Sequence, residues 1–297
     1  MAKRFVLAAA LAVGLAAAVA VAQYQGEVDV TAVVVPVTVR TSSGKLATSV
    51  PRKKFHLKID GMTVPIRDLD LEADLPISLA FILDTSGSMA GRKLVGCQQL
   101  VNAFLQHRRD DDELALWTFA DERVLERFPF GMGWYLLPRV LETIEPWSTT
   151  ALYDMVQRVP EVMEKASHHR RAAILLTDGV DNASQIGATQ AEELARHLET
   201  PIYALGVEPP PANPDASGTS YEEILTLIAD ASGGHYQRIP QAEAMPRAVD
   251  ELVEELSSRY ILTFTTSGVG AQKWRELEVE VDGYEATARS GYVGTLP

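Results

Sequence analysis

Two hydrophobic patterns follow one another along the chain. Between residues 77 and 258, continuous apolar runs of strand length alternate with longer segments whose apolar residues recur at helical spacing. Continuous apolar runs are typical of parallel strands that are buried on both faces. Strands are predicted at 77–83, 113–119, 123–128, 171–177 and 201–207, the last of these being the final parallel strand. This stretch therefore predicts an α/β fold with a doubly wound, mostly parallel sheet.

The segments between these runs predict the helices. Their apolar residues lie three and four positions apart, as on one face of a helix. Helices are expected near 92–109, 135–144, 151–159, 188–199, 221–231 and 241–257. Pro160 is expected to end or kink the third of these, because proline lacks the N–H that a helix interior needs.

Both ends of the chain show alternation of apolar and polar residues instead. This pattern is typical of antiparallel strands with one face in water, and Asp60-Gly61 and Asp282-Gly283 predict hairpin turns within it. Residues 69–76 are acidic, end in proline and suit a linker. We therefore expect a small β-sandwich-like domain built from residues 23–75 plus 259–297, with the α/β unit, residues 76–258, inserted into it.

The first 22 residues have the features of a signal peptide. Lys3 and Arg4 precede an unbroken apolar run at 5–21, and Ala20-Val21-Ala22 matches the small-residue pattern of a cleavage site. The run also approaches the length that spans a bilayer, so the same residues allow an uncleaved anchor, the one expected contact with a membrane. The expected location is the periplasm or the exterior of the cell.

Charge and cysteine content narrow the class of protein. Lys and Arg number 27 against 40 Asp and Glu, which gives a formal net charge of −13. Such a charge repels phosphate, so no nucleic-acid partner is expected. The single cysteine, Cys97, lies among apolar residues of a predicted helix and is expected to be a buried thiol. Without an intramolecular disulfide, an exported chain depends on its core, which fits a bacterial periplasmic or secreted protein.

Oxygen-bearing side chains stand where several predicted elements begin or end. They are Asp84, Ser86 and Ser88 after the first buried strand, a hydroxyl of the stretch Ser148-Thr149-Thr150 at a helix start, and Asp178 after a later strand. Ligands in open α/β sheets bind beyond the carboxyl ends of the strands, so these side chains are expected to converge there. Carboxylate and hydroxyl oxygens suit Mg²⁺, Mn²⁺ or Ca²⁺ better than zinc or copper. The residues therefore predict a divalent-cation site.

The order and spacing of these residues resembles the von Willebrand factor type A domain and its metal-ion-dependent adhesion site (MIDAS). The resemblance rests on Leu-Asp-Thr-Ser-Gly-Ser-Met at 83–89, Thr-Ala-Leu-Tyr-Asp at 150–154 and Leu-Thr-Asp-Gly-Val-Asp at 176–181. It covers about residues 76–258. With its β-rich ends and a closing Ser-Gly-Tyr at 290–292, the mature chain is also similar to bacterial exported "VWFA-related" proteins.

The resemblance implies a role for each residue. Ser86 and Ser88 would bind the cation directly through their hydroxyls. Thr150, for which Thr149 is the neighbouring alternative, would bind it directly or through water. Asp84 and Asp178 would act mostly through water. Neutral hydroxyl ligands leave the cation electrophilic, so a carboxylate of a partner protein can take its remaining position.

Other polar and aromatic residues invite interpretation. Asp154 and Asp181 are near enough in sequence to orient hydroxyls or waters around the cation, although Asp154 also suits the first turn of a helix. His168-His169 has no further ligand at zinc-binding spacing and is expected to be a solvated loop. Trp134 and Trp147 are candidates for a binding rim, with core packing or loop anchoring as the simpler interpretation.

The sequence favours an exported, non-enzymatic protein-binding or cell-adhesion module that recognises an acidic side chain through a bound cation. One alternative is a hydrolase that uses the same ion to activate water, although the motif segments contain no His or Glu base. Another alternative is a structural subunit of an envelope assembly, in which the ion only stabilises the loops around it.

Overall fold

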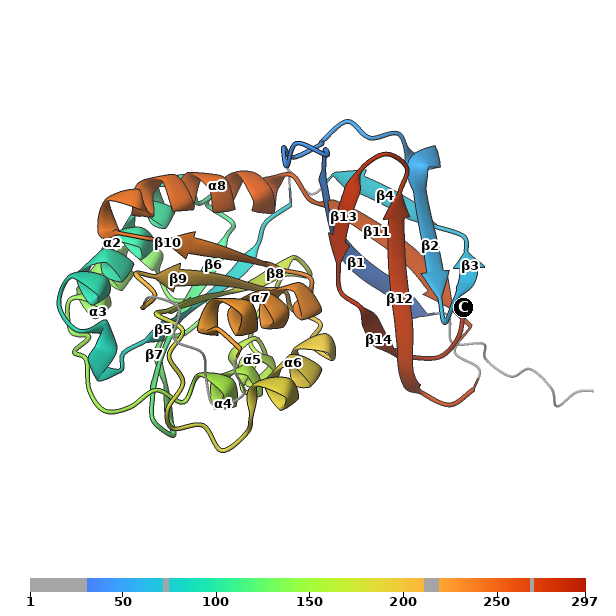
Figure 1. The fold of residues 1–297 in the computed structure, drawn as a ribbon. Helices are drawn as coiled ribbons and strands as arrows, with labels where there is room; N and C mark the ends of the chain where they lie inside the picture. Colours follow the sequence, from blue (N-terminus) through green and yellow to red (C-terminus); the bar gives the residue numbers. More distant parts are fainter. Residues whose placement is uncertain (1–30, 72–74, 211–218, 268–269) are drawn as a thin grey trace, which may run out of the picture.

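The computed structural model of the chain describes residues 31–71, 75–210, 219–267 and 270–297. The signal peptide predicted at 1–22 lies outside these ranges. The described residues form a six-stranded sheet with helices on both faces and, beside it, two four-stranded antiparallel sheets (Figure 1). We call these the α/β part and the β part. Within the described ranges, the helices are too short or too polar to cross a membrane.

The six-stranded sheet is doubly wound and mostly parallel, as predicted. Its strands are β5 (Ser78–Asp84), β6 (Glu113–Ala120), β7 (Arg123–Phe128), β8 (Arg171–Thr177), β9 (Ile202–Val207) and β10 (His235–Ile239). They lie in the order β10-β9-β8-β5-β6-β7, and β7 alone runs antiparallel to its neighbour. The chain therefore reverses direction across the sheet between β5 and β8. Such a switch point opens a crevice at the carboxyl ends of the two strands.

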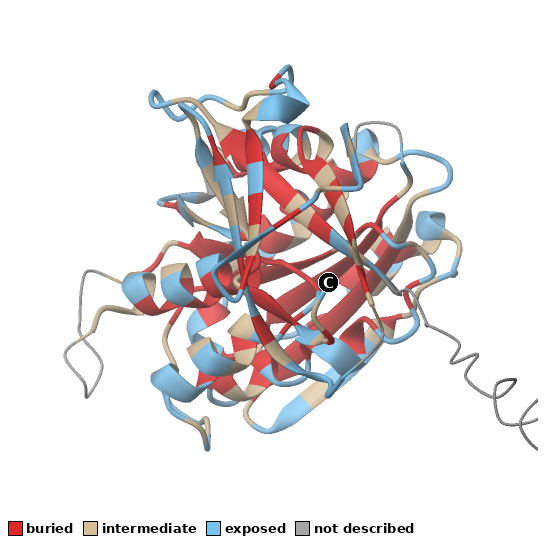
Figure 2. Ribbon diagram, turned by 90° about the vertical axis from the view of Figure 1, so that its right-hand side faces the viewer, coloured by how far each residue is buried: buried red, intermediate tan, exposed pale blue. Residues whose placement is uncertain are grey.

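Helices cover both faces of this sheet, and each face has its own apolar core. The first face carries α2 (Arg92–His107), α3 (Leu137–Leu141) and α8 (Met245–Ser257). The second face carries α4 (Leu152–Val156), α5 (Val159–Val162), α6 (Ala188–Arg196) and α7 (Tyr221–Ser232). Figure 2 shows the buried strands between helices whose outward faces are exposed. Short 3₁₀ helices lie at Arg52–Lys54, Gly87–Met89, Trp134–Leu136 and Ala242–Ala244.

One expectation for the α/β part is wrong. Residues 202–207 are not the last parallel strand, because β10 pairs in parallel with β9 beyond it. Most residues of β10 are exposed or half-buried, which is typical of an edge strand and unlike the continuous apolar runs. The helix that begins after Ala151 ends ahead of Pro160, at Val156, as expected. Pro160 itself lies in the first turn of α5, where a missing N–H costs nothing, so two short helices replace one.

The β part combines strands from both ends of the chain. One sheet has the order β13 (Glu285–Ala288), β1 (Thr31–Arg40), β11 (Tyr260–Thr266), β4 (Asp68–Leu71). The other has the order β14 (Gly291–Gly294), β12 (Lys273–Val281), β2 (Phe55–Ile59), β3 (Met62–Val64). The sheets share one core, in which Val37, Leu57 and Phe264 are buried. This arrangement agrees with the expectation that the termini pair with each other.

Of the two hairpin turns predicted in the β part, one is confirmed and one is wrong. Asp60-Gly61 joins β2 to β3 as a hairpin, with φ of 48° and 76°. Asp282-Gly283 joins β12 to β13, but β13 pairs with β1 in the other sheet, so this turn crosses between sheets. The predicted linker also begins later than residue 69, because β4 pairs with β11 as far as Leu71.

The two covalent connections between the parts lie side by side. β4 precedes β5, α8 precedes β11, and β4 and β11 are neighbouring antiparallel strands with Leu71 opposite Tyr260. The buried Arg259 stands at the second connection, where its Nη1 lies 3.3 Å from the hydroxyl oxygen of Tyr203. The α/β part is thus inserted between adjacent strands of one sheet.

Candidate metal centre

Asp84 is the last residue of β5, a strand whose seven residues are all buried. Its Oδ1 accepts a hydrogen bond of 2.8 Å from the Ser86 N–H. Its Oδ2 accepts one of 2.6 Å from the hydroxyl of Thr177, the last residue of β8. The carboxylate therefore joins the two strands across the switch point of the sheet.

Burial raises the pKa of the Asp84 carboxyl from 3.8 to about 6, while the hydrogen bonds from Thr177 and Ser86 oppose the rise. The negative charge of Asp178 adds a smaller increase. A divalent cation beside Asp84 would favour the charged form, because an opposite charge offsets the cost of desolvation. The environment of this carboxyl therefore suits a bound cation.

Ser86 and Ser88 lie on the tight turn that follows β5. Their hydroxyl oxygens are 3.1 Å apart, with Ser86 buried and Ser88 exposed. The Gly87 N–H between them donates to the Ser148 carbonyl at 2.9 Å. The turn thus presents two hydroxyls on one side and holds the loop of residues 145–150 through its backbone.

Thr150 ends that loop and is buried, whereas its neighbour Thr149 is exposed. The Thr150 N–H donates to Oδ1 of Asn182 at 2.8 Å, and its carbonyl accepts from the N–H groups of Asn182 and Ala183 at 3.1 and 2.9 Å. The Trp147 N–H donates to the Thr85 carbonyl at 2.7 Å. The three predicted metal-site loops are therefore cross-linked by hydrogen bonds at one edge of the sheet.

Asp178 directly follows β8 and is buried. Its Oδ2 forms an ion pair of 2.8 Å with Nζ of Lys93, in the first turn of α2. Its Oδ1 accepts from the Val180 N–H at 3.4 Å. The structure thus places a positive group at this carboxylate.

The donor set fits a hard divalent cation. Two carboxylates, Asp84 and Asp178, and three hydroxyls, Ser86, Ser88 and Thr150, stand on loops that meet at the carboxyl ends of β5 and β8. In the described ranges no group of three or more His, Cys, Asp or Glu residues is placed to hold a metal ion. Hydroxyl groups supply three of the five candidate ligand side chains, and the five ligands stay a prediction.

Asp154 and Asp181 bind backbone around the centre. Oδ2 of Asp181 accepts from the Tyr153 N–H at 3.1 Å and the Ser184 hydroxyl at 2.5 Å. The Asp154 carboxylate lies in the first turn of α4 and accepts from the N–H of Gln185 at 3.0 and 3.1 Å. Both carboxylates brace the loop after β8 against the start of α4.

The two tryptophans lie at opposite ends of the sheet. Trp147 is on the loop beside the centre, and the Arg123 guanidinium lies 4.5 Å from its ring centroid. Trp134 is stacked against Arg108, 3.7 Å from the ring centroid, just after the far end of α2. The suggestion that Trp134 lines the rim of this site is therefore wrong, because β7 carries the chain away from that edge before Trp134.

Three residues that hold the centre together were not predicted from the sequence. Thr177 binds Asp84, Asn182 binds Thr150, and Lys93 pairs with Asp178. Thr177 lies within the motif at 176–181 and Asn182 directly follows it, so their position was the available signal. Lys93 had a different signal, because a cation in the first turn of a helix opposes the helix dipole and needs a compensating anion.

Stability of the metal-free protein should depend on Asp84 between about pH 5 and 7.5. Its folded pKa of about 6 exceeds the unfolded value, so the folded state binds the extra proton at the lower pH. We expect this group to reduce the unfolding free energy by about 1 kcal/mol as pH rises through this range. Urea unfolding in EDTA measures the change. Asp84→Asn should lack this contribution, and an identical pH dependence in both proteins would contradict it.

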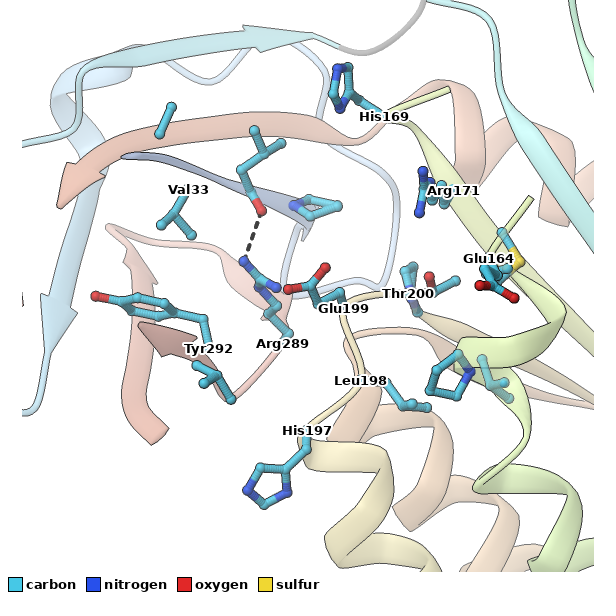
Figure 3. Close-up of a pocket in the computed structure, with 18 residues that line it drawn as sticks. Val33, Glu164, His169, Arg171, His197, Leu198, Glu199, Thr200, Arg289 and Tyr292 are labelled. Atoms are coloured by element: carbon cyan, nitrogen blue, oxygen red, sulfur yellow. Dashed lines mark hydrogen bonds between the residues drawn. The ribbon is translucent and has the colours of Figure 1, made fainter. Parts of the chain in front are cut away.

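A cavity between the two parts lies away from this centre. It has a volume of about 660 Å³ and separates the α/β part from the β part, with Val33, Arg171, Leu198 and Arg289 in its lining (Figure 3). Arg171 begins β8, whereas Asp178 follows its end. The cavity is thus at the opposite edge of the sheet, where Nη2 of Arg289 donates to the Val34 carbonyl at 3.1 Å.

Comparisons with known proteins agree with this architecture. Residues 79–180 match the model of the von Willebrand factor type A domain family. The inter-alpha-trypsin inhibitor heavy chain H3 of Homo sapiens is 26% identical over 148 residues, which are 44% of this chain and 16% of that protein. The chain thus spans a small share of the length of that relative.

Two solved structures share the fold at low identity. A von Willebrand factor type A protein from Catenulispora acidiphila has a TM-score of 0.50 at 13% identity, covering 92% of this chain and 75% of that one. Proximal thread matrix protein 1 from the mussel byssus, with a zinc-occupied MIDAS motif, has a TM-score of 0.51 at 16% identity, covering 66% and 50%. At these identities the likeness concerns the fold alone.

Proposed function

Since residues 79–180 form a von Willebrand factor type A domain, we propose that the chain is a protein-binding module that works outside the cytoplasm. It recognises an Asp or Glu side chain of its partner through a divalent cation at the carboxyl edge of β5 and β8. The observation that supports this most is the hydrogen-bonded junction of three loops that carry the predicted ligands. The signal peptide predicted before residue 23 supports the location.

The proposed ligands make two different contributions to the site. Ser86, Ser88 and Thr150 supply neutral hydroxyl oxygens, while Asp84 and Asp178 supply negative charge around them. A bound Mg²⁺, Mn²⁺ or Ca²⁺ ion provides a Lewis-acidic position for an external carboxylate. The mussel protein with a zinc-occupied MIDAS motif adds zinc as a cation to test here. The chain's own residues fix the loops, so that they need little rearrangement.

The surroundings of Ser86 favour binding over catalysis. An activated serine nucleophile needs a base within hydrogen-bond reach. The Ser86 hydroxyl contacts the Ser88 hydroxyl, and the Ser86 N–H is bonded to Asp84. Both contacts suit a positioned metal ligand and support a binding role for the proposed module.

Removal of the cation should abolish capture of the partner. We expect the immobilised chain to retain a protein from native cell-envelope extract in Mg²⁺, to release it in EDTA, and to retain it again after excess Mg²⁺ is restored. Ser86→Ala should retain none, whereas Ser43→Ala, in an exposed turn of the β part, should behave as wild type. Capture that persists in EDTA would overturn the proposed function.

A further inference from the structure

The N-terminus of α2 carries two adjacent cations, where the helix dipole disfavours positive charge. Its N-cap, Gly91, provides no side-chain cap, and the first turn contains no acidic residue. Each cation instead pairs with a carboxylate from another strand end. Nε of Arg92 lies 2.8 Å from Oε2 of Glu208, and Nζ of Lys93 lies 2.8 Å from Oδ2 of Asp178. The two pairs hold this end of the helix against the metal edge of the sheet.

The two ion pairs differ in their exposure to water. The Arg92 side chain is 81% exposed, whereas those of Lys93 and Asp178 are 19% and 2% exposed. Solvent screens an exposed pair strongly and a buried pair weakly. The Lys93 ammonium therefore acts on Asp178, and on any cation near it, with much less attenuation than Arg92 acts on its surroundings.

We propose that Lys93 is an internal competitor of the divalent cation. Its ammonium occupies Asp178 in the metal-free protein, opposes entry of the ion, and leaves the loaded centre with excess positive charge for an acidic ligand. The inference rests on the proposed function, because it concerns the regulation of the same site. In this role, Lys93 makes the binding of the metal and the binding of the acidic partner cooperative.

Formal charges explain the cooperativity. The metal-free centre holds the carboxylates of Asp84 and Asp178 and the ammonium of Lys93, so one negative charge is left over. A divalent cation converts this to one positive charge, which a single carboxylate from a partner neutralises. Without Lys93, the cation and the two aspartates balance before any partner arrives. Lys93 therefore favours the fully assembled complex over the centre loaded with metal alone.

The same charges affect the pKa of the Cys97 thiol, at a third position on the helix. Cys97 lies one turn after Lys93, and burial raises the pKa of its thiol, with further increases from Asp84 and Asp178 and an opposing effect from Lys93. Asp84 itself is bonded to Ser86 and Thr177, so Lys93 is the cation placed at the centre by an ion pair.

Calorimetric titration of the metal-free full chain with Mn²⁺ alone tests the proposal. Lys93→Met and Lys93→Gln should each bind Mn²⁺ about tenfold more tightly than wild type, since a coupling of this size is usual between interacting sites. Arg92→Met removes the same charge from the neighbouring position and is the matched control. It should stay within about twofold of wild type, because the Arg92 side chain is 81% exposed and solvent screens its charge.

Thermal unfolding supplies a second readout. Lys93→Met should melt below wild type without metal, because Asp178 loses its partner, and should show a larger rise of Tm on addition of Mn²⁺. Binding by Lys93→Met and Lys93→Gln that equals or falls below wild type would overturn the competitor role while the proposed function stands. Absence of Mn²⁺ binding in wild type and all variants would overturn the proposed function and this inference with it.

Discussion

Replacing Ser86 with alanine is expected to weaken Mn²⁺ binding by about 100-fold or more, since even changes around a metal ligand cost about 10- to 100-fold in affinity. The hydroxyl is buried and lies 3.1 Å from that of Ser88. The substitution leaves the Ser86 N–H free to bond to Asp84, so the turn should keep its shape. Calorimetry with Mn²⁺ measures the loss, and circular dichroism checks the fold.

Thr85→Val is the matched control for this prediction. Thr85 is a buried residue of the same turn, but its hydroxyl donates to the Phe119 carbonyl at 3.1 Å and belongs to none of the predicted ligands. The variant should lose stability by about 1 kcal/mol for the lost hydrogen bond and should bind Mn²⁺ as wild type does. Equal affinities for Ser86→Ala and wild type would remove Ser86 from the ligand set.

Phe81→Ala is expected to lower the unfolding free energy by about 3–5 kcal/mol, as is usual for a large aromatic residue in a core. Phe81 lies in the middle of β5, is fully buried, and packs edge-on against Phe104 of α2 with 5.4 Å between ring centroids. Removal of its ring leaves a cavity between the central strand and the helix that carries Lys93. Urea unfolding followed by fluorescence measures the change.

A surface leucine provides the comparison. Leu125 lies on β7, the edge strand of the same sheet, and is 42% exposed. Leu125→Ala should cost less than about 1 kcal/mol, because a large share of its surface stays in contact with water in the folded state. If Phe81→Ala and Leu125→Ala were equally destabilised, the core described for the first face of the sheet would be wrong.

The α/β part was largely predictable because its strands are buried on both faces. Burial of this kind requires continuous apolar runs, and the runs at 113–119 and 171–177 coincide with β6 and β8 within one residue. The predicted metal ligands were visible for a related reason. Four of the five stand at or just after the ends of two strands, and parallel strands bring their carboxyl ends to one edge.

The features that were missed depend on contacts between distant residues. β10 is an edge strand with little apolar pattern, and Asp282-Gly283 has the sequence of a hairpin although the following strand pairs with β1. In both cases, the local pattern of apolar and polar residues does not show which strand becomes the neighbour. The same holds for Asn182, whose side chain is recognisable as a support for Thr150 only when the loops are together.

The insertion of the α/β part between β4 and β11 determines how a mechanical load would pass through the molecule. A pull on a partner held at the metal edge reaches the β part through two neighbouring covalent tethers, at Leu71 and Tyr260, that enter adjacent strands of one sheet. Two attachments share tension and resist twisting about the axis of pull, which a single linker permits. The paired connections therefore restrict rotation of the inserted part about that axis.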